Sequence, residues 1–299
     1  MADVLSIIIP TYNRHTALKR VLLSVAQYRP PASEVIIVDQ SPDSREQASI
    51  LLNQFPFVKY IRIKRVGLPH ARNVGIRNST GTVLLFIDDD TCVHPNCFTE
   101  HLKSHARQGI SAVAGRIKQM NKNVSWAPTE TVAAIDPETG ETTGNFDITY
   151  EGTISYATGG HMSIKRKVFR DAGLFNPKFI GNALFEDVEF SCRIRKKGYP
   201  IYYNAQAIVY HYPAENGGCH ASDTTGYLIE RLHNHLLFYT LHIKKIPSKP
   251  FILYMKNLVE YISRTPQNRH SFLRISQCIV AMIQAYKHAC ISRYFYPKL

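Results

Sequence analysis

The sequence has little of what a secreted, disulfide-stabilised or membrane-spanning protein needs. Its six cysteines are irregularly spaced and form no disulfide framework, so we expect reduced thiols and a cytoplasmic location. No run of about 18 apolar residues occurs, and no basic, apolar and small-residue leader opens the chain, so we expect neither a transmembrane helix nor a signal peptide. The absence of Gly-x-Gly-x-x-Gly and Gly-Lys-Ser/Thr loops also argues against dinucleotide and Walker-type nucleotide binding.

Acidic residues are scarce at the C-terminal end. From residue 225 onward eleven Lys and Arg stand against Glu230 and Glu260, within a net charge of +13. Because the positive charge belongs to a terminal region rather than to the whole chain, no nucleic-acid partner is expected. Interleaved Tyr, Phe and Leu leave two interpretations of this region: a helical cap with a solvated charge, or a peripheral contact with an anionic membrane.

Three carboxylates, Asp88, Asp89 and Asp90, follow directly after an uncharged run at residues 82–87. The run is typical of a strand buried on both faces. Adjacent negative charges at the end of a strand repel one another, and packing gives no reason to place them there. A hard divalent cation between them and a diphosphate would balance the charge; a solvated acidic turn is the alternative.

The first 90 residues alternate between strands and helices. Apolar runs predict strands at residues 5–10, 34–39, 58–63 and 82–87, and helical spacing predicts helices from 16 to about 29 and over 70–79. This order predicts an α/β fold with an open, mostly parallel sheet flanked by helices, which forms a Rossmann-like nucleotide-binding half. Ligands of such sheets collect at the carboxyl ends of the strands.

The pattern is less regular further along the chain. We expect helices at 95–107, 166–172 and 185–197, a strand at 110–117, and two short strands at 201–204 and 207–210. Residues 120–151 are polar with little periodicity and predict a long surface loop or lid. Basic helices near 226–243, 250–263 and 271–286 then form a C-terminal extension. We therefore predict a main domain at 1–224 and a helical region at 225–299.

Six short motifs occur in a fixed order. They are Ile7-Ile8-Ile9-Pro10-Thr11-Tyr12-Asn13-Arg14, Val38-Asp39, Gly67 through Ala71-Arg72-Asn73-x-Gly75, Phe86-Ile87-Asp88-Asp89-Asp90, Gly159-Gly160-x-Met162 and Phe185-Glu186-Asp187. Each is weakly specific, but together they resemble the family 2 glycosyltransferases, which have the GT-A fold. The resemblance covers roughly residues 4–240.

The resemblance implies an enzyme that moves a sugar from a nucleoside-diphosphate sugar, commonly UDP-linked, to an acceptor hydroxyl. Such transfer usually inverts the anomeric carbon and uses Mn²⁺ or Mg²⁺. The acceptor would be a saccharide or a lipid-linked saccharide, for glycan or polysaccharide biosynthesis. In this scheme residues 1–115 form the nucleotide-binding half and residues 116–224 the acceptor-binding half.

The resemblance also implies roles for individual residues. The nucleotide would be bordered by Pro10, Thr11, Tyr12 and Arg14, by Asp39 at the base, by Arg72 and Asn73 at the base or phosphates, by Asp88 at the ribose, and by Asp89 without a separate role. The metal ligands would be Asp90 and His211. The donor-sugar or acceptor pocket would be lined by Gly159 and Gly160, where we expect a turn that needs unrestricted φ angles. Asp187, with Glu186 beside it, would take the acceptor proton.

Two rivals belong to other classes of protein. A non-catalytic nucleotide or nucleic-acid binding protein on a degenerate transferase fold is disfavoured, because the acidic triplet and the Glu186-Asp187 pair are intact. A nucleotidyltransferase is disfavoured because no glycine-rich basic loop follows the first strand.

Cysteine and histidine recur between residues 92 and 105, at Cys92, His94, Cys97, His101 and His105. The pattern invites a zinc interpretation. The cysteines are five residues apart rather than three, however, and fall in a predicted amphipathic helix, so we expect a packed helix and no zinc site.

Overall fold

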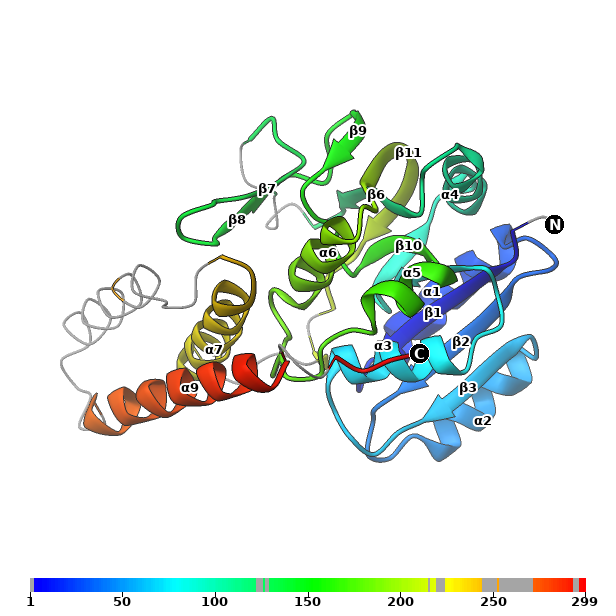
Figure 1. Cartoon of the computed structure of the whole chain (residues 1–299). Helices are drawn as coiled ribbons and strands as arrows, with labels where there is room; N and C mark the ends of the chain where they lie inside the picture. Colours follow the sequence, from blue (N-terminus) through cyan, green and yellow to red (C-terminus); the bar gives the residue numbers. More distant parts are fainter. Residues whose placement is uncertain are drawn as a thin grey trace.

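We describe the protein from a computed structural model (Figure 1). The structure describes residues 3–121, 126, 129–214, 216–218, 224–243, 252, 271–292 and 296–299. None of the helices in these ranges is long and apolar enough to cross a membrane.

The N-terminal half is built as the strand and helix pattern predicts. Its strands are β1 (Leu5–Thr11), β2 (Glu34–Asp39), β3 (Val58–Arg62) and β4 (Val83–Ile87), and its helices are α1 (His15–Tyr28), α2 (Arg45–Gln54) and α3 (Leu68–Arg77). β1 pairs in parallel with β2 and with β4, and β2 with β3. Helix α2 was not anticipated, because it buries only Leu51 and therefore shows little apolar periodicity.

The second half extends the same sheet, mostly through antiparallel strand pairs. They are β5 (Thr91–Val93), α4 (Cys97–Ala106), β6 (Ala112–Gln119), β9 (Glu151–Ile154), β10 (His161–Lys165), α5 (Arg166–Ala172), α6 (Glu186–Lys196) and β11 (Ile201–His211). The strand order is β3-β2-β1-β4-β10-β6-β11-β5, with β9 also paired to β11. The open, mixed sheet with its parallel N-terminal strands confirms the predicted fold class.

Two expectations for the second half were wrong. Residues 201–211 form one strand, because the register slips between Asn204 and Ile208 at a bulge while pairing with β6 continues on both sides. The polar segment 120–151 is not structureless, since β7 (Ala133–Ile135) and β8 (Thr142–Gly144) pair as an antiparallel hairpin within it.

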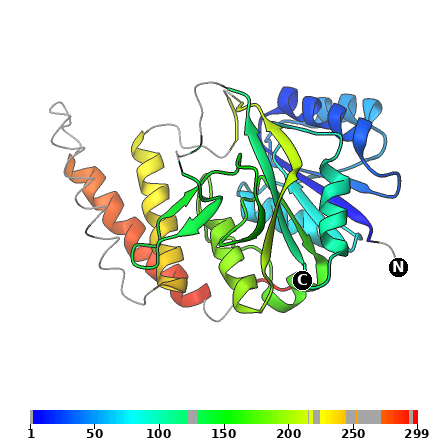
Figure 2. The same cartoon turned by 90° about the horizontal axis from the view of Figure 1, so that it is seen from above.

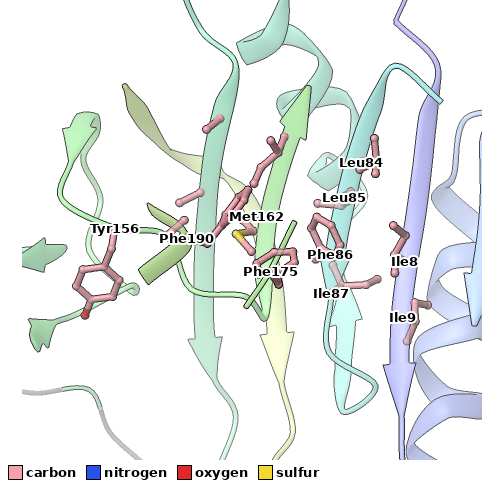
Figure 3. Close-up of a cluster of buried hydrophobic side chains, with 14 of the residues drawn as sticks. Ile8, Ile9, Leu84, Leu85, Phe86, Ile87, Tyr156, Met162, Phe175 and Phe190 are labelled. Atoms are coloured by element: carbon pink, nitrogen blue, oxygen red, sulfur yellow. The ribbon is translucent and has the colours of Figure 1, made fainter. Parts of the chain in front are cut away.

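Helices cover both faces of the sheet. A Cβ added to Gly75 of α3 would lie 2.5 Å from Ile8, and Phe86, opposite Ile8 in the sheet, contacts Phe169 of α5. On the other face, Ser163 of β10 contacts His101 of α4. Figure 3 shows the aromatic side of the core, where Phe86, Met162, Phe175 and Phe190 lie together between the sheet and the helices.

The C-terminal region packs against this body. Helix α7 (Thr224–His242) lies beside α9 (Ser271–Ser292), away from the sheet (Figure 2). The last residues return to α6, where the Tyr296 hydroxyl donates a hydrogen bond to Glu189 Oε1 at 3.0 Å. The predicted helices near 226–243 and 271–286 are thus confirmed, while the one near 250–263 lies outside the described residues, apart from Ile252.

Candidate active site

A hollow opens at the carboxyl ends of β1, β2 and β4. It is lined by Pro10, Thr11, Tyr12, Arg14, Gln40, Leu68, Asp88, Asp89, Asn182 and Gly218. A second hollow, between the start of α1 and the segment after β11, shares Arg14 with the first. The Arg14 guanidinium therefore stands between the two.

The acidic triplet divides into three environments. The side chains of Asp89 and Asp90 are 5% and 6% exposed, whereas that of Asp88 is 41% exposed. Asp89 accepts a hydrogen bond from Thr11 Oγ1 at 2.6 Å and pairs with Arg14 Nη1 at 3.1 Å. Burial nevertheless raises the pKa of Asp89 to about 7. Asp89 thus holds the β1 loop and Arg14 in place.

Asp90 faces His211 from the neighbouring strand. Asp90 Oδ1 lies 3.2 Å from His211 Nε2 and accepts no hydrogen bond of ordinary geometry from any described residue. His211 Nδ1 lies 2.7 Å from Gln119 Oε1. An amide oxygen can only accept, so Nδ1 carries a proton and Nε2 is directed at Asp90.

The charges of this pair support each other. Burial alone lowers the pKa of His211, but the Asp90 carboxylate outweighs it and leaves that pKa raised. Burial likewise raises the pKa of Asp90, and His211 and Arg14 reverse the effect and leave it lowered. A neutral His211 would point a lone pair at the carboxylate, so the gap between them suits a proton or a cation.

Gly159 and Gly160 connect the two acidic ends of the site. Gly160 accepts a hydrogen bond from the Asp88 backbone N–H at 3.3 Å, and the Gly159 N–H donates to Asp187 Oδ2 at 2.9 Å. Neither glycine has a positive φ angle, so the expected need for unrestricted φ was wrong. Space decides instead: a Cβ would lie 2.5 Å from Asp88 Oδ2 at Gly160 and 2.4 Å from the Arg72 guanidinium at Gly159.

Asp187 and Glu186 have different surroundings although they are adjacent. Asp187 is half-buried, at the start of α6, and accepts a second hydrogen bond from the Val188 N–H at 2.8 Å. Glu186 is 2% exposed and forms a close ion pair with Arg72. Arg72 is also 2% exposed and lies 3.8 Å from Asp88. Only Asp187 of the two carboxylates is open to a ligand.

Three of the expected nucleotide-binding residues, Asp39, Arg72 and Asn73, do not line the hollow. Asp39 is fully buried; Oδ1 accepts from the Ser41 N–H at 2.8 Å, and Oδ2 accepts from the Tyr60 hydroxyl. Asn73 exchanges hydrogen bonds of 2.8 and 2.9 Å with the Phe175 backbone. The polar atoms of Asp39 and Asn73 are thus hydrogen-bonded to neighbouring segments of the protein.

Sequence reasoning assigned no role to Gln119 or to Gln40, although Gln40 follows a predicted strand at the sheet edge where ligands collect. Gln40 lines the hollow directly after Asp39, and Gln119 orients His211 from the end of β6. The parallel pairing of β6 and β11 sets Gln119 opposite His211. That register could not be deduced from the sequence, so no signal pointed to Gln119.

Comparison with known proteins agrees with this architecture. An uncharacterized glycosyltransferase of Haemophilus influenzae is 39% identical over 95 residues, which is 31% of each chain. Glycosyltransferase AglE of Haloferax volcanii is 23% identical over 233 residues, covering 76% of this chain and 69% of AglE. The chain thus spans about a third of the first relative and about two thirds of the second.

Two solved structures show the same fold. GalNAc-T7 with UDP, GalNAc and Mn²⁺ superposes with a TM-score of 0.62 at 18% identity, over 88% of this chain and 55% of that one. The mannosyltransferase PcManGT of Pyrobaculum calidifontis, in complex with GDP-Man and Mn²⁺, superposes with a TM-score of 0.58 at 16% identity, over 99% and 88%. The fold is therefore of the GT-A type.

The family model for glycosyl transferase family 2 matches residues 6–173. This span holds β1 through α5 with the acidic triplet and Gly159-Gly160, and it covers more than half of the chain. The chain belongs to glycosyl transferase family 2.

Proposed function

We propose that this chain is a metal-dependent, inverting glycosyltransferase that moves a sugar from a UDP-linked donor to an acceptor hydroxyl. The observation that carries the proposal is the Asp90–His211 pair. Its oxygen and nitrogen face each other at 3.2 Å, and Gln119 fixes the His211 ring from behind.

The residues present fit a divalent ion between Asp90 and His211. A metal-bound histidine normally donates its other N–H to a fixed acceptor, which Gln119 provides here. A carboxylate with an imidazole suits Mn²⁺ better than Mg²⁺, which prefers oxygen ligands alone. Such an ion would bind the diphosphate and stabilise the negative charge that develops on it as the bond between sugar and phosphate breaks.

Arg14 supplies a permanent positive charge at the same place. Its Nη1 atom lies 3.1 Å from Asp89 and 3.0 Å from Asp90, and its side chain borders both hollows. A diphosphate in either hollow therefore meets a guanidinium that is already held in position. The nucleoside would lie along Pro10, Tyr12 and Gln40, with the more exposed Asp88 at the ribose.

Asp187 is proposed as the single base. An inverting displacement needs one group to take the acceptor proton. Two backbone N–H groups orient the Asp187 carboxylate beside the Gly159-Gly160 segment. Glu186 would act indirectly, since its ion pair holds Arg72 beneath Gly159. The acceptor would be a saccharide or a lipid-linked saccharide, with the 120–151 segment and α7 as candidates for its contacts.

Calorimetric titration with Mn²⁺ and a panel of UDP-sugars and GDP-mannose tests the donor class. We expect saturable binding of a UDP-sugar that disappears with EDTA and in Asp90→Asn, while Glu46→Gln, on the outer helix α2, behaves as wild type. Binding without hydrolysis or transfer would favour a non-catalytic nucleotide-binding protein. Binding of no donor would contradict the proposal. A preference for GDP-mannose would show that the nucleobase of the donor is guanine rather than uracil.

The outer face of α9 is proposed to contact an anionic membrane. Ile279, Ile283 and Tyr286 form an exposed stripe, 44%, 64% and 55% accessible, while Ala281 and Ala285 are buried on the opposite side. Apolar side chains on a basic region are the features that favour interfacial binding. The protein should sediment with vesicles of phosphatidylcholine and phosphatidylglycerol, and less so as Ile283→Asp. Equal sedimentation of the variant, or none of the wild type, would contradict this contact.

A further inference from the structure

A cluster of soft ligand atoms lies inside the protein, between helix α4 and strand β10. Cys97 Sγ is 3.3 Å from His161 Nε2, and His101 Nε2 is 3.0 Å from the same nitrogen. The ligand atoms of all three residues lie within 4.8 Å of one another, and all three side chains are 0% exposed. Cys97 and His101 are four residues apart, so they share one face of α4.

Both histidine rings are fixed from behind. His161 Nδ1 lies 3.2 Å from the Arg116 carbonyl oxygen, and His101 Nδ1 lies 2.7 Å from Ser163 Oγ. His105 Nε2 contacts that same hydroxyl at 2.8 Å. With these contacts the two Nε2 atoms face each other and Cys97 Sγ lies beside that of His161, and protein scaffolds usually orient metal-binding histidines by such contacts to the other ring nitrogen.

The spacing suits an ion of ordinary size. With bonds of about 2.0–2.1 Å to nitrogen and 2.3 Å to sulfur, a tetrahedral zinc site has edges of about 3.3 Å between nitrogens and about 3.6 Å between sulfur and nitrogen. The distances from His161 Nε2 to Cys97 Sγ and to His101 Nε2, 3.3 and 3.0 Å, would therefore each lengthen by about 0.3 Å, and the third pair, Cys97 Sγ and His101 Nε2, lies within 4.8 Å. The backbone makes room for the His161 ring at Gly115, where a Cβ would lie 2.1 Å from His161 Cε1.

We propose that Cys97 Sγ, His101 Nε2 and His161 Nε2 form a buried binding site for a soft d¹⁰ metal ion, zinc(II) or copper(I). One thiolate and two imidazoles are the ligands that these ions share. The site has no residue in common with the Asp90–His211 pair, which is proposed to hold a hard divalent ion through a carboxylate. The spacing argument against zinc considered only residues 92–105, whereas the third ligand proposed here, His161, comes from β10.

The protonation states of the three side chains allow a metal ion to replace the proton of Cys97. Burial lowers the pKa of His161 to about 3 and that of His101 well below its ordinary value, so both imidazoles are neutral and can offer lone pairs. Burial raises the pKa of the Cys97 thiol. Binding therefore forms three metal–ligand bonds and releases one proton, from Cys97 Sγ, to solvent. The copper(I) complex would be neutral and the zinc complex would keep one positive charge.

The proposed ion joins α4 to the strand that leads out of the active site. His161 follows Gly160 and pairs with Ile87, the residue before Asp88. An ion held there would fix β10 against the helix and, through it, the Gly159-Gly160 segment. Without an ion the same atoms can form a hydrogen-bond chain, in which the Cys97 thiol and the His101 Nε2–H both donate to His161 Nε2. Metal analysis distinguishes the two arrangements.

The experiment measures metal in untagged, full-length protein from cultures supplemented with zinc or with copper, after dialysis against EDTA. We expect about one equivalent of zinc or copper per chain by plasma mass spectrometry, and the supplement that fills the site identifies the ion. Cys97→Ser should lose it, and Ser163→Ala should bind it about 10- to 100-fold more weakly, as loss of an orienting partner usually does. Cys92→Ser, a half-buried cysteine outside the cluster, is the matched control and should keep it.

A second measurement does not depend on a variant that folds. Wild-type protein refolded with Co²⁺ should show a thiolate-to-cobalt absorption band, and Asp90→Asn should show the same band because it alters only the other site. Retention of a full equivalent of metal in Cys97→Ser would overturn the proposal. So would a wild type that holds neither ion and gives no cobalt–thiolate band.

Discussion

Lowering the pH should weaken Mn²⁺ binding through His211. The Asp90 carboxylate raises the pKa of His211 against the opposing effect of burial, so the metal-free protein holds an imidazolium at 3.2 Å from Asp90 Oδ1 as the pH falls. Metal can bind only the neutral ring. Below the His211 pKa, each pH unit should therefore cost about tenfold in Mn²⁺ affinity, or about 1.4 kcal/mol.

The assay is titration calorimetry with Mn²⁺ between pH 6 and pH 8.5, in two buffers of different ionisation enthalpy. The wild type should release about one proton per ion at the acid end and none at the alkaline end. Gln at position 211 cannot titrate. The Mn²⁺ affinity of His211→Gln should therefore be lower than that of the wild type at high pH and should lack the decrease with falling pH that protonation of His211 causes. Asp89 has a pKa of about 7 and titrates in the same range; Asp89→Asn is the control and should keep the His211 slope. A wild-type affinity independent of pH, or a slope unchanged in His211→Gln, would refute the assignment.

Three further predictions follow from the geometry. Asp187→Asn should retain donor binding in calorimetry but lose about 10²–10⁴-fold in transfer rate, the usual contribution of a positioned base; full transfer activity would remove Asp187 from that role. Gly160→Ala places a Cβ 2.5 Å from Asp88 Oδ2, so the Asp88 carboxylate must rotate away. Loss of the proposed hydrogen bond between Asp88 and the donor ribose should lower donor affinity about 10- to 150-fold. An unchanged dissociation constant would show that Asp88 does not touch the donor. Burial raises the pKa of Glu189, but Arg193 and further partners outweigh burial and lower it to about 2 from 4.5. This carboxylate therefore stabilises the fold above pH 4.5, and the stabilisation, about 3 kcal/mol, is lost as the pH falls toward 2. In urea unfolding, the free energy of unfolding of Glu189→Gln should fall less between these pH values than that of the wild type, and an equal fall in both proteins would refute the linkage.

Much of the fold could be predicted because the patterns are local. Strands β1, β2 and β4 contain the apolar runs Ile7–Ile9, Val35–Val38 and Val83–Ile87, each followed within two residues by a polar one, and α5 begins and ends where the sequence predicts. Elements that bury little surface, such as α2, carry too weak a pattern to be read. The bulge in β11 depends on its partner strands and leaves no local trace.

For the candidate site, the sequence determined which residue types stand at the ends of which strands, since the motifs and the alternation of strands and helices are encoded by neighbouring residues. Only the tertiary structure decided how those residues are used. It set Gln119 behind His211, enclosed Arg72 with Glu186, buried Asp39, and brought His161 to the α4 cysteine and histidine. Each of these contacts joins segments far apart in the chain, so strand register and packing determine it rather than local sequence.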